Sequence, residues 1–357
     1  MKKYLWVLLL LLIIFPQTIQ AAEIPEEVLD ALPDGAGSWL TLEQADPRSF
    51  QDGFKALWEQ AGELLPSLLR DTAGGAARLL LVMLICAIAE SGFAAAGASM
   101  QILRLAAVLS AAQIALSDVN YLIGQSVSVM EELNVFSKAL LPALSAAASA
   151  GGAVSAGMRQ VVTILFSDLL LTLIRTCLLP LVYLYIAAVT ADAMLPTHRL
   201  RRIGEGIRRG VTWLLTGLIF LFTAWLSLSG AAASAADAAA VQLTRTAIST
   251  AVPVVGGMIA EAGDSILAAA SVVKSTLGIF GLLAVIGTCL EPFLQLGIQY
   301  LLFKLTAFAS ESVGGGALAE LLDGLGSAFA LILGMAGSCA LTLLIAVSAF
   351  LTAVVGR

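Results

Sequence analysis

Long apolar stretches alternate with short polar segments along most of this chain. Six stretches are close to or above the roughly 20 residues that an α-helix needs to cross the hydrocarbon core of a membrane. They cover residues 77–97, 102–123, 161–191, 211–233, 277–302 and 327–354. The pattern predicts an all-α, polytopic membrane protein with about six transmembrane helices.

Two further segments carry apolar residues on one helical face only. In 125–144 the apolar positions recur every three or four residues, at Val129, Leu133, Phe136, Leu140 and Leu144. In 254–275 the apolar positions cover a narrow arc, and Glu261 and Asp264 lie on the opposite face. Both patterns predict interfacial helices on the outer leaflet. Glu261 and Asp264 are then candidates for an outer vestibule.

A five-residue pattern, Thr-Cys-Leu-x-Pro, occurs twice, at 176–180 and at 288–292. Pro180 and Pro292 end the two copies and are expected to bend their helices, because proline cannot donate a backbone hydrogen bond. One interpretation is an internal repeat, with units 125–234 and 235–357 after a first transmembrane hairpin, 76–124. The alternative is chance similarity between two apolar helices.

The N-terminus has the three regions of a signal peptide. Lys2 and Lys3 precede an apolar run, and small residues follow near Ala21. This predicts a signal peptide over 1–21, with an uncleaved membrane anchor as the alternative. The next segment, 22–75, holds eleven acidic residues against three basic ones. We expect this acidic segment to lie outside the cytoplasm, against the membrane body or a partner.

Composition supports the membrane interpretation and excludes several functions. Of the 357 residues, 59% are hydrophobic and 12% are charged, whereas ordinary soluble domains carry about 25% charged residues. The acidic segment and the net charge of −6 argue against nucleic-acid binding. The four cysteines lie in apolar runs without metal-ligand spacing, and Gly-x-Ser-x-Gly, His-Glu-x-x-His and Walker A motifs are absent from the sequence. We expect neither enzymatic activity nor a cofactor.

Basic residues concentrate in one segment between predicted spans. The segment 192–210 contains Arg199, Arg201, Arg202, Arg208 and Arg209. The positive-inside rule places it in the cytoplasm, together with 98–101 and 303–326. Glycines at 314–316, 324 and 326 predict that 303–326 is a flexible loop. The arginines are either a topology signal alone or a contact for a cytoplasmic partner or anionic lipid.

Ionisable residues inside predicted spans are candidate functional residues, because charges are costly in a membrane. The candidates are Glu90, Asp168, Arg175 and Glu291. Asp168 and Arg175 lie two helical turns apart on one face, so we expect them to pair or to share a polar cavity. Two roles remain open for the candidates, namely helix packing and the lining of a transport path.

The order of segments resembles that of the stage III sporulation protein AE family of endospore-forming bacteria. The resemblance rests on the signal peptide, the acidic segment, the alanine-rich membrane body with its Thr-Cys-Leu-x-Pro helices, and stretches such as 139–160 and 249–292. It implies a multi-pass protein of the mother-cell membrane facing the forespore.

The same resemblance implies a function and partners. The expected function is a permease-like component of a secretion-like channel that supports forespore development after engulfment. The expected partners are other stage III sporulation A proteins, including a cytoplasmic ATPase and ring-forming membrane proteins, and indirectly the forespore protein Q. An ion-coupled secondary transporter and a non-transporting membrane scaffold are the alternatives.

Overall fold

The computed structural model describes residues 24–33, 50–96, 100–150, 153, 155–195, 200–251, 256–312 and 316–352. Within these ranges it describes all side chains except those at 50–52, 76, 83, 86–96, 100–104, 107, 230–251, 256–271, 274 and 352. The predicted signal peptide lies outside the described residues.

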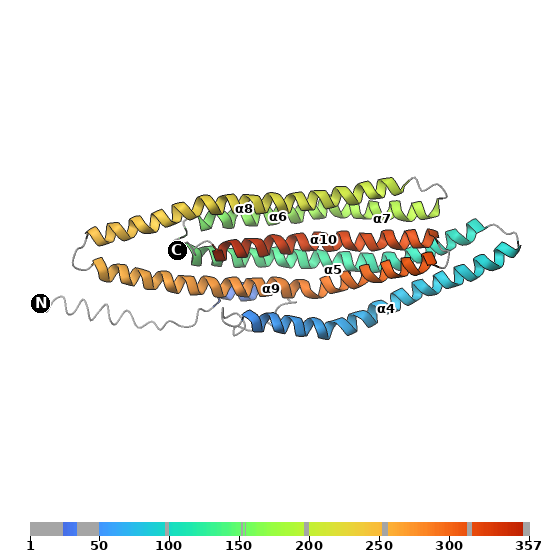
Figure 1. Ribbon diagram of the computed structural model, residues 1–357, viewed down its shortest axis with the longest axis horizontal. Helices are drawn as coiled ribbons and strands as arrows, with labels where there is room; N and C mark the ends of the chain where they lie inside the picture. Colours follow the sequence, from blue (N-terminus) through green and yellow to red (C-terminus); the bar gives the residue numbers. More distant parts are fainter. Residues whose placement is uncertain are drawn as a thin grey trace.

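The described residues form a bundle of long helices joined by short connections (Figure 1). In chain order the elements are α2 (Glu26–Asp30), α4 (Phe50–Ala96), α5 (Met100–Ala150), α6 (Ala156–Leu173), the π-helix η2 (Ile174–Leu178), α7 (Leu179–Met194), α8 (Arg201–Ala251), α9 (Gly256–Ser312) and α10 (Gly316–Thr352). The segments α6, η2 and α7 follow one another without a break. No strand occurs in the described part of the chain.

Five described segments are long and apolar enough to cross a membrane. They are Val108–Ala150, Ala156–Met194, Arg201–Ser229, Ser275–Ser312 and Gly316–Leu351. The first predicted span, 77–97, falls in α4, where most of its side chains lie outside the described set. The chain is therefore an all-α, multi-pass membrane protein, as its apolar pattern predicts.

Successive long helices run in opposite directions (Figure 1). The C-terminal ends of α4, α7 and α9 and the N-terminal ends of α5, α8 and α10 all lie at the right-hand end of Figure 1. These helix ends fall in or next to the three segments that the sequence places in the cytoplasm. We call this the arginine end, because the first turns of α8 carry Arg201, Arg202, Arg208 and Arg209 there.

The helices are longer than a membrane requires. α8 has 51 residues and α9 has 57, which correspond to lengths of about 76 and 86 Å, against a hydrocarbon core of about 30 Å. The end of α8 and the start of α9 form a hairpin that extends beyond α10 (Figure 1). The sequence predicts a separate interfacial helix over 254–275, but its described part, 256–275, is the first part of α9. The side chains of Glu261 and Asp264 lie outside the described set.

The structure also differs from the prediction at 125–144. This segment is the interior of α5, and its stripe from Leu133 to Leu144 is buried in a core that includes Phe280 of α9 and Val347 of α10. A stripe with a period of three to four residues shows that one face is covered, but it does not say by what. Here other helices cover it, so the segment is not a separate helix lying on lipid.

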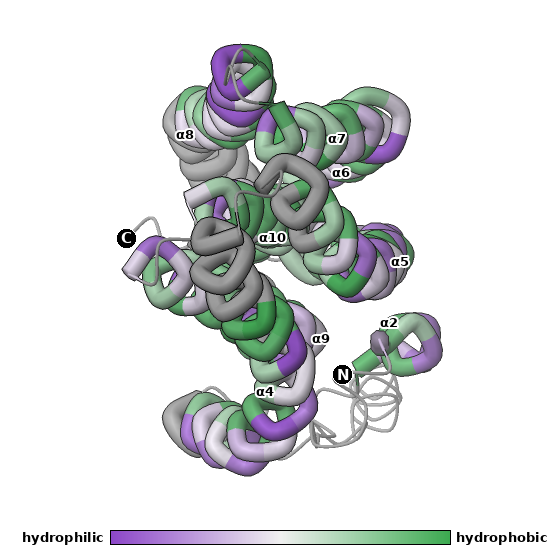
Figure 2. Tube along the Cα trace, turned by 90° about the vertical axis from the view of Figure 1, so that its right-hand side faces the viewer, coloured by the Kyte–Doolittle hydropathy of each residue, from purple (hydrophilic) through white to green (hydrophobic). Residues whose placement is uncertain are grey.

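α10 occupies the centre of the bundle (Figure 2). Near the arginine end its Phe329 and Ile332 are fully buried, and near the opposite end Val347 and Phe350 are buried. The two positions belong to two hydrophobic clusters that follow one another along the bundle. α4 lies on the outside, against α5 and α9.

The described parts of the acidic segment pack against the rest of the bundle. Val28 of α2 and Leu57 of α4 are buried in the same cluster as Val129 and Leu133 of α5. α2 and the beginning of α4 therefore both rest on α5.

The two Thr-Cys-Leu-x-Pro copies have different surroundings. The first copy lies largely in η2, with Thr176 and Cys177 exposed, while Thr288 and Cys289 of the second are buried in α9. A proline ring clashes with the carbonyl four residues earlier. A π-turn just before Pro180 widens the helix where that clash would occur. The internal repeat itself stays a prediction.

Candidate functional site at the arginine end

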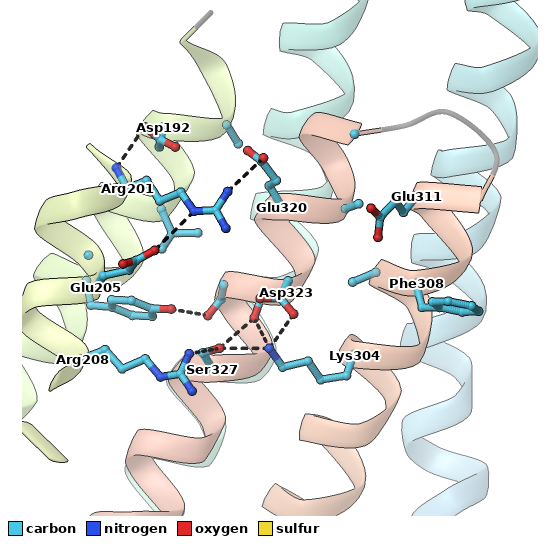
Figure 3. A pocket seen from close by; sticks show the side chains of 18 residues that line it. Asp192, Arg201, Glu205, Arg208, Lys304, Phe308, Glu311, Glu320, Asp323 and Ser327 are labelled. Carbon is cyan, nitrogen blue, oxygen red and sulfur yellow. Dashed lines mark hydrogen bonds and ion pairs between the residues drawn. The ribbon is translucent and has the colours of Figure 1, made fainter. Parts of the chain in front are cut away.

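A cavity of about 540 Å³ lies at the arginine end between α7, α8, α9 and α10 (Figure 3). Eight of the residues that line it are ionisable acids or bases: Asp192, Arg201, Glu205, Arg208, Lys304, Glu311, Glu320 and Asp323. The cavity is therefore a polar, mixed-charge site at one end of an apolar bundle.

The first two turns of α8 form one wall of the cavity. Arg201, Glu205 and Arg208 are spaced by three or four residues, so they share one face of the helix. The buried Gly204 lies on the same face, where a Cβ atom would be 3.5 Å from the ring of Tyr185. This is an ordinary van der Waals distance, so α8 packs against the Tyr185 ring of α7 at this position.

The beginning of α8 is fixed by a carboxylate from α7. Asp192 is buried, and its Oδ1 accepts hydrogen bonds from the backbone N–H groups of Leu200, at 2.9 Å, and Arg201, at 3.1 Å. The first N–H groups of a helix have no partner inside the helix, so an acidic side chain there satisfies them. Asp192 thereby sets where α8 starts and which residues face the cavity.

Lys304 of α9 is the centre of the opposite wall. Its Nζ lies 2.6 Å from Asp323 Oδ1 and donates to the Asp323 carbonyl oxygen, at 3.1 Å, and to Ser327 Oγ, at 3.1 Å. Arg208 Nη1 also donates to Ser327 Oγ, at 3.4 Å. The hydroxyl oxygen of Ser327 in α10 therefore accepts hydrogen bonds from both Arg208 of α8 and Lys304 of α9.

Two further contacts tie α10 to its neighbours. Arg201 Nη1 lies 3.3 Å from Glu320 Oε1. The hydroxyl of Tyr185 donates to the carbonyl oxygen of Gly324 at 3.0 Å. A Cβ atom at Gly324 would overlap the side chain of Val189, so α7 and α10 meet at this glycine.

The charges that line the cavity are not all paired. Arg201 contacts Glu205 as well as Glu320, and Lys304 contacts Asp323. Arg208 and Glu311 are exposed, and neither has an oppositely charged partner within the described part of the chain. The site can thus offer one cation and one carboxylate to a bound molecule.

The sequence analysis predicted only part of this site. Of the predicted arginines, Arg201 and Arg208 line the cavity, whereas Arg202 and Arg209 are exposed and do not. Arg199 lies outside the described residues. Lys304 and the α10 residues were missed because the glycines of 303–326 favoured a loop. The described parts of that segment, 303–312 and 316–326, are helical. The sequence did contain a sign of this helix: Glu320, Asp323 and Ser327 are spaced by three and four residues, which puts them on one helical face.

Direct pairing of Asp168 with Arg175 was one of the two arrangements expected, and the structure does not have it. Instead, Asp168 contacts Lys138 of α5, and Arg175 contacts Glu131 of α5. The helical spacing was interpreted correctly, but α5 offers closer opposite charges to each. Glu90 lies among the side chains that are not described.

Glu291 lies far from the arginine-end cavity. It lines a cavity of about 430 Å³ between α4, α5 and α9, together with Glu132 and the buried Pro292. Gln295 donates to Glu291 Oε1 at 3.0 Å. One turn further along α9, Gln299 donates to Asp118 Oδ2 at 3.0 Å, beside another cavity of about 310 Å³. Polar groups thus follow the inner side of α4.

None of these sites suggests a metal centre. Within the residues that the structure describes, no three His, Cys, Asp or Glu side chains come together in a group that could hold a metal ion.

Comparison with known proteins covers most of the chain. The profile described as stage III sporulation protein AE matches residues 46–354. The stage III sporulation protein AE of Bacillus subtilis (strain 168) is 26% identical over 211 residues, which are 59% of this chain and 53% of that protein. The chain thus matches about half the length of this curated relative. No solved structure matches the chain. Because the profile spans α4 to α10, this chain belongs to the stage III sporulation protein AE family.

Proposed function

We propose that this chain is a permease-like, non-enzymatic component of the stage III sporulation complex in the mother-cell membrane. Membership of the family supports the role in sporulation, and the five apolar helices support a multi-pass position in the membrane. The observation that carries the proposal is the mixed-charge cavity at the end that the arginines assign to the cytoplasm.

The cavity is suited to docking a cytoplasmic protein. Arg208 of α8 and Glu311 of α9 stand on opposite walls, each exposed and each without an opposite charge from the described residues (Figure 3). A partner segment that carries a carboxylate and a cation would complement both. The cytoplasmic ATPase that the family resemblance implies is the partner we assign to this site.

Charge reversal inside the cavity tests this assignment. We expect Arg208→Glu to reduce capture of the ATPase by the membrane protein at least tenfold and to reduce sporulation. Its abundance in the membrane should be unchanged, because Arg208 has only a 3.4 Å hydrogen bond to lose. Capture is measured by affinity purification from sporulating cells, with a deletion strain as the baseline. That deletion should leave engulfment intact and stop forespore development afterwards.

Arg202→Glu is the matched control. It makes the same charge change near the same end of α8, but Arg202 does not line the cavity. Docking in the cavity predicts that this variant captures the ATPase normally. Equal losses for Arg202→Glu and Arg208→Glu would mean that the arginines act through their total charge, as a topology signal does, and would exclude a docking site.

A further inference from the structure

Two ion pairs join α5 to the α6–η2 segment on the surface of the bundle. Lys138 Nζ lies 2.7 Å from Asp168 Oδ1, and Asn134 donates to the same oxygen at 2.8 Å. Two turns away, Arg175 of η2 pairs with Glu131 of α5. We call this surface, defined by Glu131, Lys138, Asp168 and Arg175, the charged face.

The charged face is only half covered by the protein itself. Between 42% and 53% of each of the four charged side chains is exposed. Packing within one chain therefore leaves part of every charge in contact with its surroundings.

The length and apolar composition of the two helices place these surroundings inside the membrane. The four residues lie in the apolar spans Val108–Ala150 and Ala156–Met194, and Arg175 is equidistant from the two ends of the second span. At a rise of about 1.5 Å per residue, it lies about 30 Å from either end, so a centred hydrocarbon core about 30 Å thick would enclose it. On the outer side of the same helix, Leu165 and Leu169 are about 60% exposed.

Charges that face lipid at this depth are costly, and a second protein surface can remove the cost. Ion pairing within the chain reduces the cost, but lipid cannot solvate the half of each charge that remains exposed. A partner surface with opposite charges at the same depths would complete the solvation. The question is which partner carries them.

A second copy of this chain carries them in the required order. The α5 side presents Lys138 and Glu131, and the α6–η2 side presents Asp168 and Arg175 at the matching depths. Two copies inserted in the same direction are related by a two-fold axis along the membrane normal, which preserves depth and exchanges the two sides. Lys138 then faces Asp168 of the other copy, and Glu131 faces Arg175 of the other copy. Every charge gains a second neighbour of opposite sign.

We propose that the charged face is the contact between two copies of this chain within the membrane. The apolar side chains that flank the charges, including Val135 on α5, pack around them in this contact, since they are exposed in the single chain. The proposal concerns a different surface from the arginine-end cavity and does not depend on docking there.

Exchange of one ion pair provides a specific test. In a chain with Lys138→Asp and Asp168→Lys, the pair within the chain is preserved, so folding is expected to be preserved as well. Two exchanged copies also complement each other. One exchanged and one unchanged copy, however, bring like charges together at both of these contacts.

The experiment co-expresses two differently tagged copies and measures their co-purification from membranes. We expect capture between two unchanged copies and between two exchanged copies, and at least tenfold less capture between an exchanged and an unchanged copy. The control exchanges the exposed pair on α4, with Lys55→Glu and Glu59→Lys. Because this pair lies outside the charged face, mixed capture with an unchanged copy should be normal.

Two outcomes would overturn the proposal. Equal capture in all three combinations would mean that the copies meet at another surface, and absence of capture between unchanged copies would mean that another protein or water covers the charged face. If the first exchange does not accumulate, Glu131→Arg with Arg175→Glu makes the same test at the second pair.

A crosslink in intact membranes gives an independent measurement. Val135 lies between Glu131 and Lys138 on α5, and the exposed Thr172 lies between Asp168 and Arg175 on α6. In a Cys177→Ser background, Val135→Cys in one copy and Thr172→Cys in the other should be joined by a short bismaleimide. Failure of this crosslink in membranes that contain both copies would also overturn the proposal.

Discussion

Lys304 of α9 contacts both the side chain and the backbone of Asp323 of α10, with its Nζ 2.6 Å from Oδ1 and 3.1 Å from the carbonyl oxygen. Only 25% of the lysine side chain is exposed, whereas 59% of the aspartate side chain is. The contact therefore joins a largely covered cation to a carboxylate that water still reaches. It holds α9 and α10 together at the arginine end.

The exposure of Asp323 predicts a weak contribution to stability. In a double-mutant cycle with Lys304→Ala and Asp323→Ala, we expect a coupling free energy below about 1 kcal/mol, because water screens the exposed partner. The measurement is the unfolding free energy of the purified protein in detergent. A coupling above about 2 kcal/mol would mean that the cavity is dry, and the picture of an open docking site would then fail.

The sequence predicted the parts of the fold that depend on local pattern. The apolar runs identified the helices, and counting alternating spans grouped 98–101, 192–210 and 303–326 at one end, where the structure has the helix ends next to them. A helix-period stripe such as Leu133 to Leu144 identified a covered face correctly. It could not identify the covering helices, because lipid and a neighbouring helix favour the same residues.

The candidate site could be predicted only in part, for a related reason. Arg201 and Arg208 were found because charge clusters are visible in a sequence. Lys304 and Asp323 lie far along the chain from these arginines and reach the same cavity only through the packing of α9 and α10 against α7 and α8. For Asp168 the sequence offered Arg175 on the same helix as one candidate partner, since Lys138 becomes its neighbour only in the folded bundle.

Gly324 of α10 provides a test of the contact between α7 and α10. A Cβ atom there would overlap Val189, so we expect Gly324→Ala to force the helices apart and to destabilise the protein by about 1–3 kcal/mol. The loss should appear as a lower unfolding temperature in detergent. The hydrogen bond from Tyr185 to the Gly324 carbonyl oxygen would be disturbed as well.

Two variants separate this clash from the general effect of replacing a helical glycine. Gly217→Ala on α8 meets no atom within 4 Å, and alanine favours helix over glycine by about 1 kcal/mol, so this variant should be as stable as the original or more so. Gly324→Ala combined with Val189→Ala should recover part of the loss. A Gly324→Ala protein as stable as the Gly217→Ala protein would show that α7 and α10 are not in contact at this position.

Asp192 links the end of α7 to the start of α8, and this link determines which side chains face the cavity. Its Oδ1 accepts two backbone hydrogen bonds, from Leu200 and Arg201. Removal of a helix-capping side chain costs about 0.5–2 kcal/mol, so we expect Asp192→Ala to lower the unfolding free energy by that amount. It should also make 195–200 more accessible to protease, because the first turn of α8 loses its anchor.

Asp192→Asn distinguishes the hydrogen bonds from the negative charge. Asparagine keeps a side-chain oxygen that can accept from the same two N–H groups, and it is as good a capping residue as aspartate. We therefore expect Asp192→Asn to retain most of the stability and the protease resistance that Asp192→Ala loses. If the two variants lose equal amounts, the capping contact is not what holds α8 in place. The positions of Arg201 and Arg208 in the cavity would then depend on the other contacts of α8, such as those of Arg201 with Glu320 and of Arg208 with Ser327.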